Sequence, residues 1–207
     1  MEEVIKKSTL ALNPKFDVVY KGKMFEIITW EGKPGVIFEA AARSPGVRLL
    51  IECEKEGQKA LLLTKEIRRE AGGFDYRLPG GKVFDRLEEY NQFRLSNADM
   101  LPAAEAAAVK EGKEEVGVRG GDLSFLGVAK AGASVEWDLY YFLLKHGEFG
   151  EQEMEDSEQG DIAGLVRLTP RELFAKLSVG EIQEGRSAEM LWRWLAKNDF
   201  LTLKTDK

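Results

Sequence analysis

Cysteine and histidine are almost absent from this chain of 207 residues, which contains one of each, Cys53 and His146. A single cysteine cannot form a disulfide within the chain, and the pair is too small for a Cys/His zinc site. Mechanisms in which a histidine activates a serine or cysteine are also excluded. Any chemistry must therefore use carboxylates, lysines, arginines or a bound metal ion.

Long apolar runs and an excess of positive charge are absent too. No apolar run reaches the roughly 18 residues of a membrane span, and the acidic start of the chain does not have a signal-peptide layout, so we expect a cytoplasmic protein without membrane contact. The net charge is −6, which makes nucleic acid an unlikely partner. The hydrophobic content of 43% suffices for one domain with a small subdomain.

Apolar periodicity and turn residues divide the chain into predicted elements. Residues 1–45 predict a small antiparallel β subdomain, and 47–67 predict a hairpin. Residues 69–81 read as a loop, and the acidic stretch 146–161 reads as a second loop. The remaining patterns predict strands over 123–131, 137–145 and 162–168 and helices over 101–116, 169–180 and 187–198.

Three carboxylates stand close together on the first of these helices. Glu111, Glu114 and Glu115 have the i, i+3, i+4 spacing that places them on one helix face. Their mutual repulsion would be relieved by a hard divalent cation such as Mg²⁺, which prefers oxygen ligands. Taken alone, the helix favours a solvated acidic face that is balanced by Lys110 and Lys113, because such faces are common.

The residues around these carboxylates resemble the Nudix hydrolase box. The sequence KEGKEEVGV at 110–118 is similar to its second half, and LPGGK at 78–82 is similar to the approach to its first half. Fourteen positions separate the corresponding Gly and Arg in the family pattern, whereas Gly81 and Lys110 are 29 apart, so this chain carries an insertion of 15 residues near 84–100. Extra length in a loop costs little free energy, so the helix with the carboxylates is expected to be intact.

Three positions depart from the box. Lys110 replaces the family's Arg, Gly112 replaces an apolar residue, and Pro102 falls where the first Glu is expected. Nearby acids that could stand in for that missing Glu are Asp85, Glu88, Glu89 and Glu105.

Further passages are similar to ADP-ribose pyrophosphatases and related nucleoside-diphosphate-sugar hydrolases. They are found at 61–70, 161–173 and 180–195 within a resemblance that extends over 16–198. The resemblance implies an α/β fold, with a Nudix α/β/α sandwich and mixed sheet over 46–207. It also implies that residues 1–45 form a dimerisation subdomain, so a homodimer is expected.

The same resemblance implies an activity and its residues. The activity is hydrolysis of the diphosphate bond in ADP-ribose or a nucleotide sugar, a small-molecule substrate. Mg²⁺, or alternatively Mn²⁺, would be held by Glu111, Glu114, Glu115 and the Gly80 carbonyl. Catalysis would involve Glu114, Glu115 and a loop acid, best placed at Glu158, and Arg68 and Glu136 would bind substrate.

Several alternatives stay open at this point. Other acids lie near Glu158, and the segment 131–137 lacks the Pro of ADP-ribose hydrolases. The chain could instead be a catalytically weak Nudix-like domain that binds a nucleotide sugar as a sensor, or an interaction module. The insertion predicts a short helix over 86–95 that either covers the active-site mouth, packs on a partner subunit, or is an inert surface excursion.

Overall fold

The computed structural model describes residues 16–70, 72–96, 98–153 and 162–201. Its main sheet is mixed and follows the order β12-β5-β4-β10-β8, with β6 added to β5. The strands are β4 (Gly46–Lys55), β5 (Gln58–Arg68), β6 (Gly73–Arg77), β8 (Asp122–Ala129), β10 (Leu139–Lys145) and β12 (Ile162–Leu168). Only β4 and β10 pair in parallel among these strands. They are central and buried on both faces, which explains their nearly continuous apolar sequences.

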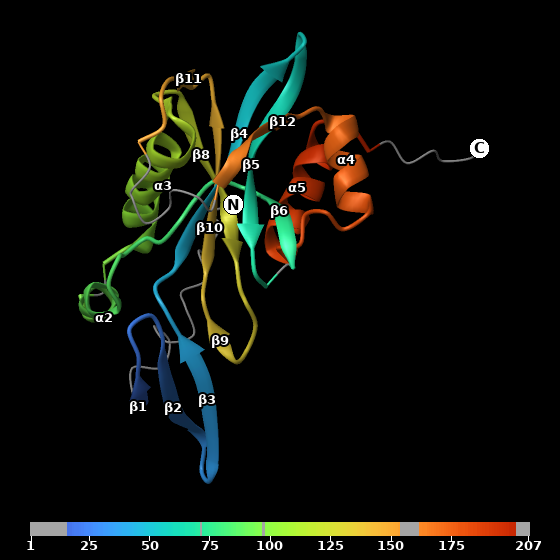
Figure 1. Ribbon diagram of the computed structural model, residues 1–207. Helices are drawn as coiled ribbons and strands as arrows, with labels where there is room; N and C mark the ends of the chain where they lie inside the picture. The colour runs from blue at the N-terminus through green and yellow to red at the C-terminus, as the bar shows by residue number, and fades with distance from the viewer. Residues whose placement is uncertain (1–15, 71, 97, 154–161, 202–207) are drawn as a thin grey trace.

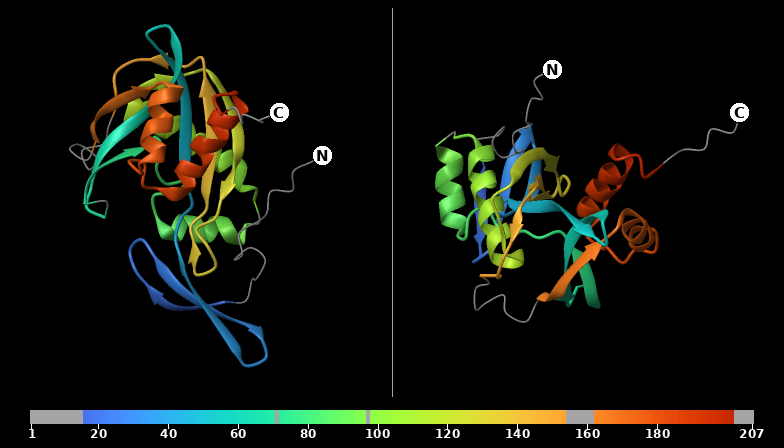
Figure 2. Two further views of the ribbon diagram at one scale, coloured as in Figure 1. Left: turned by 90° about the vertical axis from the view of Figure 1, so that its right-hand side faces the viewer. Right: turned by 90° about the horizontal axis from the view of Figure 1, so that it is seen from above.

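Helices cover both faces of the main sheet. Helix α3 (Met100–Val116) lies on one side, and α4 (Pro170–Ser178) and α5 (Gly185–Lys197) lie on the other (Figures 1 and 2). Alternate residues of the strands enter two separate cores, as the pleat of a strand requires. Along β4, Leu49 packs in the core with α3, and Leu50 packs in the core with α4 and α5. This arrangement confirms the predicted α/β/α sandwich with a mixed sheet.

The N-terminal segment forms a second sheet below the main one (Figure 1). Its strands are β1 (Asp17–Lys21), β2 (Glu26–Lys33), β3 (Val36–Ala42) and β9 (Val135–Glu136). We call these four strands the N-terminal sheet. The pairs β1–β2 and β2–β3 are antiparallel, as predicted, while β9 joins β3 in parallel and was not foreseen in this sheet. Its connection to β9 ties the N-terminal sheet to the segment that precedes β10.

The insertion contains helix α2 (Leu87–Leu95), close to the helix predicted over 86–95. The helix lies against the N-terminal sheet of its own chain (Figure 1). An Arg94 Nη2 atom lies 2.7 Å from Glu26 Oε1, and the Asn91 side-chain amide donates to Glu26 Oε2 at 3.1 Å. Because Glu26 is only 1% exposed, this ion pair is buried at the interface between α2 and β2.

Two loop predictions were wrong in part. Within 69–81, residues Gly73–Arg77 form β6, which pairs with β5. The inward-facing residue of β6 is Asp75, which accepts hydrogen bonds from Gln183 N and Arg77 Nη1, so the strand lacks the usual apolar alternation. Within the acidic stretch, β11 (Glu148–Phe149) pairs with β7 (Val118–Arg119).

Two predicted helix boundaries are confirmed, the end of α3 and the start of α4, whereas α4 ends at Ser178 and α5 covers Gly185–Lys197, each within two residues of the prediction. Helix α3 ends at Gly117, whose positive φ of 66° suits a residue without a side chain. Helix α4 begins with a capping box between Thr169 and Glu172. Within the described residues, no helix combines the length and apolar character needed to cross a membrane.

Candidate active site

A cleft of about 370 Å³ lies where the Gly80–Gly81 loop approaches α3. It is lined by Met24, Arg43, Arg48, Glu66, Arg68, Glu70, Arg77, Gly80, Gly81, Lys82, Glu115, Trp137 and Ile162. Five of these side chains are cationic and three are carboxylates. A cleft with this balance suits an anionic ligand even though the whole chain is acidic.

Two carboxylates of α3 lie directly against the Gly80–Gly81 loop. Gly80 N donates to Glu115 Oε2 at 2.7 Å, and a Cβ atom at Gly81 would lie 2.1 Å from Glu111 Oε1. Both carboxylates are buried, with Glu111 7% and Glu115 9% exposed. Glycine is required at position 80 as well as at 81, because Gly80 has a φ of 144° and a Cβ atom there would lie 2.2 Å from Val47 O.

The protonation of Glu115 reflects this burial. Removal from water is the main reason why its pKa is raised, to about 8; the nearby Glu111 contributes to this rise, and the hydrogen bond from Gly80 N opposes it. The carboxyl group therefore holds its proton at neutral pH when no cation lies beside it. A divalent cation would favour the ionised form.

A buried arginine occupies the opposite side of the loop. Arg48 Nη1 donates to Val47 O at 2.8 Å and to Gly80 O at 2.6 Å. Burial lowers the pKa of Arg48, and the nearby Arg77 lowers it further, whereas Glu115 raises it. The two backbone groups of Gly80 are thus both occupied: its amide donates to the Glu115 carboxyl group, and its carbonyl accepts from the Arg48 guanidinium.

Arg68 is held in place by a second buried carboxylate. Its Nε atom donates to Glu66 Oε2 at 2.8 Å, and Thr64 Oγ1 donates to Glu66 Oε1 at 2.6 Å. Glu66 is 4% exposed, whereas the Arg68 side chain is 35% exposed. Glu66 therefore fixes the orientation of the guanidinium through Nε and Nη2, and the Arg68 side chain lines the cleft.

Comparison with known proteins identifies the family of this chain. A family model described as the NUDIX domain matches residues 42–191. The chain belongs to the Nudix family. A crystal structure of an ADP compounds hydrolase superposes with a TM-score of 0.63 at 18% identity, covering 97% of this chain and 100% of that one.

A curated relative from Arabidopsis thaliana is Nudix hydrolase 14, chloroplastic, which is 29% identical over 100 residues. The alignment covers 48% of this chain, and the chain spans only 27% of the length of that relative.

The third glutamate of this Nudix box is placed differently from the other two. The Glu114 carboxylate lies 3.6 Å from Lys110 Nζ, and its side chain is 18% exposed. Glu136 lies in β9, where its carbonyl accepts from Arg43 N at 3.1 Å, and it is not among the residues that line the cleft. Glu158 lies outside the described residues, so its predicted role stays a prediction.

The structure does not bring the four proposed substitutes for the missing Glu into the cleft. Glu88 pairs with Lys21 on the surface at 3.1 Å, and Glu89 and Glu105 are exposed. Asp85 lines a neighbouring cavity instead. Position 102 itself is a proline in the first turn of α3.

The donor set at the loop fits a hard divalent cation. Among the described residues no group of three or more His, Cys, Asp or Glu side chains is preassembled as a metal site. Mg²⁺ nevertheless needs only one or two carboxylates, because it keeps waters and binds substrate phosphates. Glu111, Glu115 and the Gly80 carbonyl provide such oxygens, although Arg48 has to share or leave the carbonyl.

Sequence reasoning missed several groups that line the cleft, among them Arg48 and Trp137. Arg48 lies within the apolar run of β4. A charged residue in a strand that is buried on both faces is unusual, and this could have indicated a functional role for Arg48. Trp137 lies with its ring centroid 4.4 Å from the guanidinium carbons of both Arg43 and Arg186. These contacts connect three parts of the chain: the end of β3, the segment before β10, and α5. No local sequence pattern could indicate contacts between parts so far apart in the sequence.

Proposed function

We propose that this protein is a Nudix pyrophosphohydrolase that cleaves the diphosphate bond of ADP-ribose or a nucleotide sugar. The products would be a nucleoside monophosphate and a sugar phosphate. The observation that supports this best is the burial of Glu111 and Glu115 against the Gly80–Gly81 loop, where Glu115 lines a cleft with five cationic side chains.

Each group then has a role that follows from its position. Glu111, Glu115 and the Gly80 carbonyl would hold Mg²⁺, or Mn²⁺, with Glu114 completing the acidic face. When bound, the cation supplies charge stabilisation and an activated water. Arg68, oriented by Glu66, would bind diphosphate oxygens in a bidentate manner. The assignments of Glu158 as the base and of Glu136 as a substrate contact rest on the family resemblance.

The test is release of nucleoside monophosphate from a panel that contains ADP-ribose, other nucleotide sugars and dinucleoside polyphosphates. Each compound is incubated with Mg²⁺, with Mn²⁺ and with EDTA. Metal-dependent cleavage of one class is the expected result. Absence of turnover for every compound contradicts the proposal.

A second candidate is a domain that binds a nucleotide sugar without cleaving it. Pro102 replaces the first Glu of the box, and the Arg48 guanidinium occupies the carbonyl that would ligate the metal. This candidate is supported if no compound is cleaved while one panel member still raises the melting temperature.

We also propose a homodimer formed through the N-terminal sheet. Its strands expose apolar side chains, including Val19 at 60%, Tyr20 at 61% and Ile37 at 72%, more than an isolated sheet face normally leaves to water. Ile37→Lys is expected to shift the mass measured by light scattering from dimer to monomer. Val179→Lys is the matched control, because Val179 is 70% exposed at the end of α4, away from this sheet. A wild-type protein that is monomeric at micromolar concentration contradicts the proposal of a homodimer.

The cytoplasmic location of the protein stays a prediction.

A further inference from the structure

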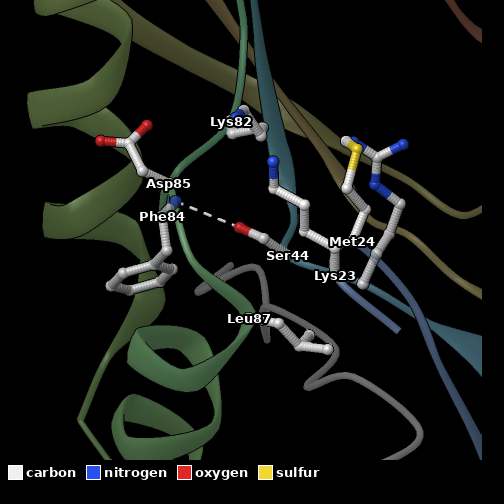
Figure 3. Close-up of a pocket in the computed structure, with 8 residues that line it drawn as sticks. Lys23, Met24, Ser44, Lys82, Phe84, Asp85 and Leu87 are labelled. Atoms are coloured by element: carbon white, nitrogen blue, oxygen red, sulfur yellow. Dashed lines mark hydrogen bonds between the residues drawn. The ribbon is translucent and has the colours of Figure 1, made fainter. Parts of the chain in front are cut away.

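A small cavity of about 20 Å³ adjoins the cleft (Figure 3). It is lined by Lys23, Met24, Arg43, Ser44, Lys82, Phe84, Asp85 and Leu87. We call it the side cavity. Three of its residues, Met24, Arg43 and Lys82, also line the cleft. The two spaces therefore lie side by side, separated by these three side chains.

Three parts of the chain build the side cavity. Lys23 lies in the turn between β1 and β2, Arg43 directly follows β3, and Lys82 directly follows the Gly80–Gly81 loop. The insertion closes the floor, where Phe84 N donates to Ser44 Oγ at 3.1 Å (Figure 3). The insertion thus contributes to a wall next to the candidate active site.

The three cations of the side cavity are not neutralised locally. Within the part of the chain that the structure describes, neither Lys23, Arg43 nor Lys82 forms an ion pair, in contrast with Arg68 and Arg77 in the cleft. The carboxylate of Asp85 points away from the Ser44 hydroxyl and the Lys23 amine (Figure 3).

Arg43 is fixed in orientation but is not saturated with hydrogen bonds. Its guanidinium carbon lies 4.4 Å from the ring centroid of Trp137 and 5.0 Å from that of Phe25. Its buried Nε atom has no hydrogen-bond partner among the described residues. The rings hold the plane of the guanidinium and supply no strong acceptor, so its terminal N–H groups can still donate to an anion.

The size and charge of the side cavity select one kind of ligand. A space of about 20 Å³ is too small for a base or a sugar ring and holds roughly one water-sized group, such as a single terminal oxygen of a phosphate group. A guanidinium and two ammonium groups around such a space match the oxygens of a phosphate group. The charge is concentrated here although the chain as a whole carries −6.

We propose that Lys23, Arg43 and Lys82 bind a phosphomonoester that the ligand carries in addition to the diphosphate. This inference rests on the proposed function, because it assumes that a nucleoside diphosphate derivative occupies the cleft. It narrows the substrate class to derivatives with a further phosphate on the sugar or nucleoside part.

The test compares ADP-ribose with ADP-ribose 1″-phosphate and ADP-ribose 2′-phosphate, which differ only by one phosphate and its position. Affinities are measured by calorimetry in EDTA, so that no turnover is needed. The wild type is expected to bind one phosphorylated compound about tenfold more tightly than ADP-ribose. Lys23→Gln is expected to bring that ratio close to one, since Lys23 lines the side cavity but not the cleft.

Lys33→Gln serves as the control, because it removes an exposed charge at the far end of β2 and should leave the ratio unchanged. Equal affinities for all three compounds in the wild type overturn the proposal, as does a ratio that Lys23→Gln does not alter. If inorganic phosphate alone binds in a Lys23-dependent manner while the ratio is one, the cavity binds free phosphate and the substrate assignment is wrong. Failure of the proposed hydrolysis is a separate result, because binding in EDTA does not depend on it.

Discussion

Replacing Glu115 with glutamine is expected to lower the rate of metal-dependent hydrolysis by about three orders of magnitude. Glutamine can still accept the hydrogen bond from Gly80 N, so the loop should keep its position. It cannot ionise, however, and a neutral amide is a much weaker ligand for Mg²⁺ than a carboxylate. The measurement is kcat with the best compound of the panel, compared with Glu105→Gln, an exposed residue of the same helix that should behave as the wild type.

A stability measurement on the same variant separates lost chemistry from lost folding. In EDTA, folded Glu115 has a pKa of about 8 against an ordinary value of 4.5. Between these two pH values the unfolded chain releases the proton and the folded chain retains it, so the free energy of unfolding should fall as the pH rises. Glu115→Gln should remove this fall and unfold at higher denaturant concentration than the wild type at pH 8. An inactive variant that is also less stable at pH 8 would contradict this reading of the site.

Most of the fold could be predicted because it is encoded in local patterns. The β4–β5 hairpin turns at Glu56 and Gly57, both with positive φ, and the polar Lys-Glu-Gly-Gln stretch between two apolar runs indicates that turn directly. Helix α3 is similarly defined by its apolar spacing and by Gly117. Strand β6 escaped prediction because its inward residue, Asp75, satisfies its charge with partners that are distant in the sequence, such as Gln183 N.

The site was predictable only where one element carries it. Glu111 and Glu115 share a helix, so their spacing sufficed to pair them. Arg48 meets Gly80 across 32 positions of the sequence, and Arg43 meets Trp137 only because β9 joins β3. Such contacts depend on the order of strands in the sheets, which residue spacing does not encode.

The variant Arg94→Met is expected to destabilise the protein by about 3–5 kcal/mol. It leaves the Glu26 carboxylate, 1% exposed, with the Asn91 amide as its remaining side-chain partner among the described residues. Chemical denaturation monitored by tryptophan fluorescence measures the change. Lys21→Met is the matched control on the same interface, since the side chains of the Lys21–Glu88 pair are 51% and 57% exposed and the loss of an exposed pair should hardly change the stability.

The double variant Glu26→Leu with Arg94→Met tests why the single variant Arg94→Met lowers the stability. If the loss comes from an uncompensated buried charge, replacing both partners with apolar residues should recover most of the stability. Equal and small effects of Arg94→Met and Lys21→Met would instead mean that α2 does not dock on β2, and that the insertion is an inert surface excursion. The insertion begins two residues after Lys82 in the chain. The docking of α2 therefore also fixes one wall of the candidate active site. If α2 detaches from β2, ligand binding should weaken before the main sheet unfolds.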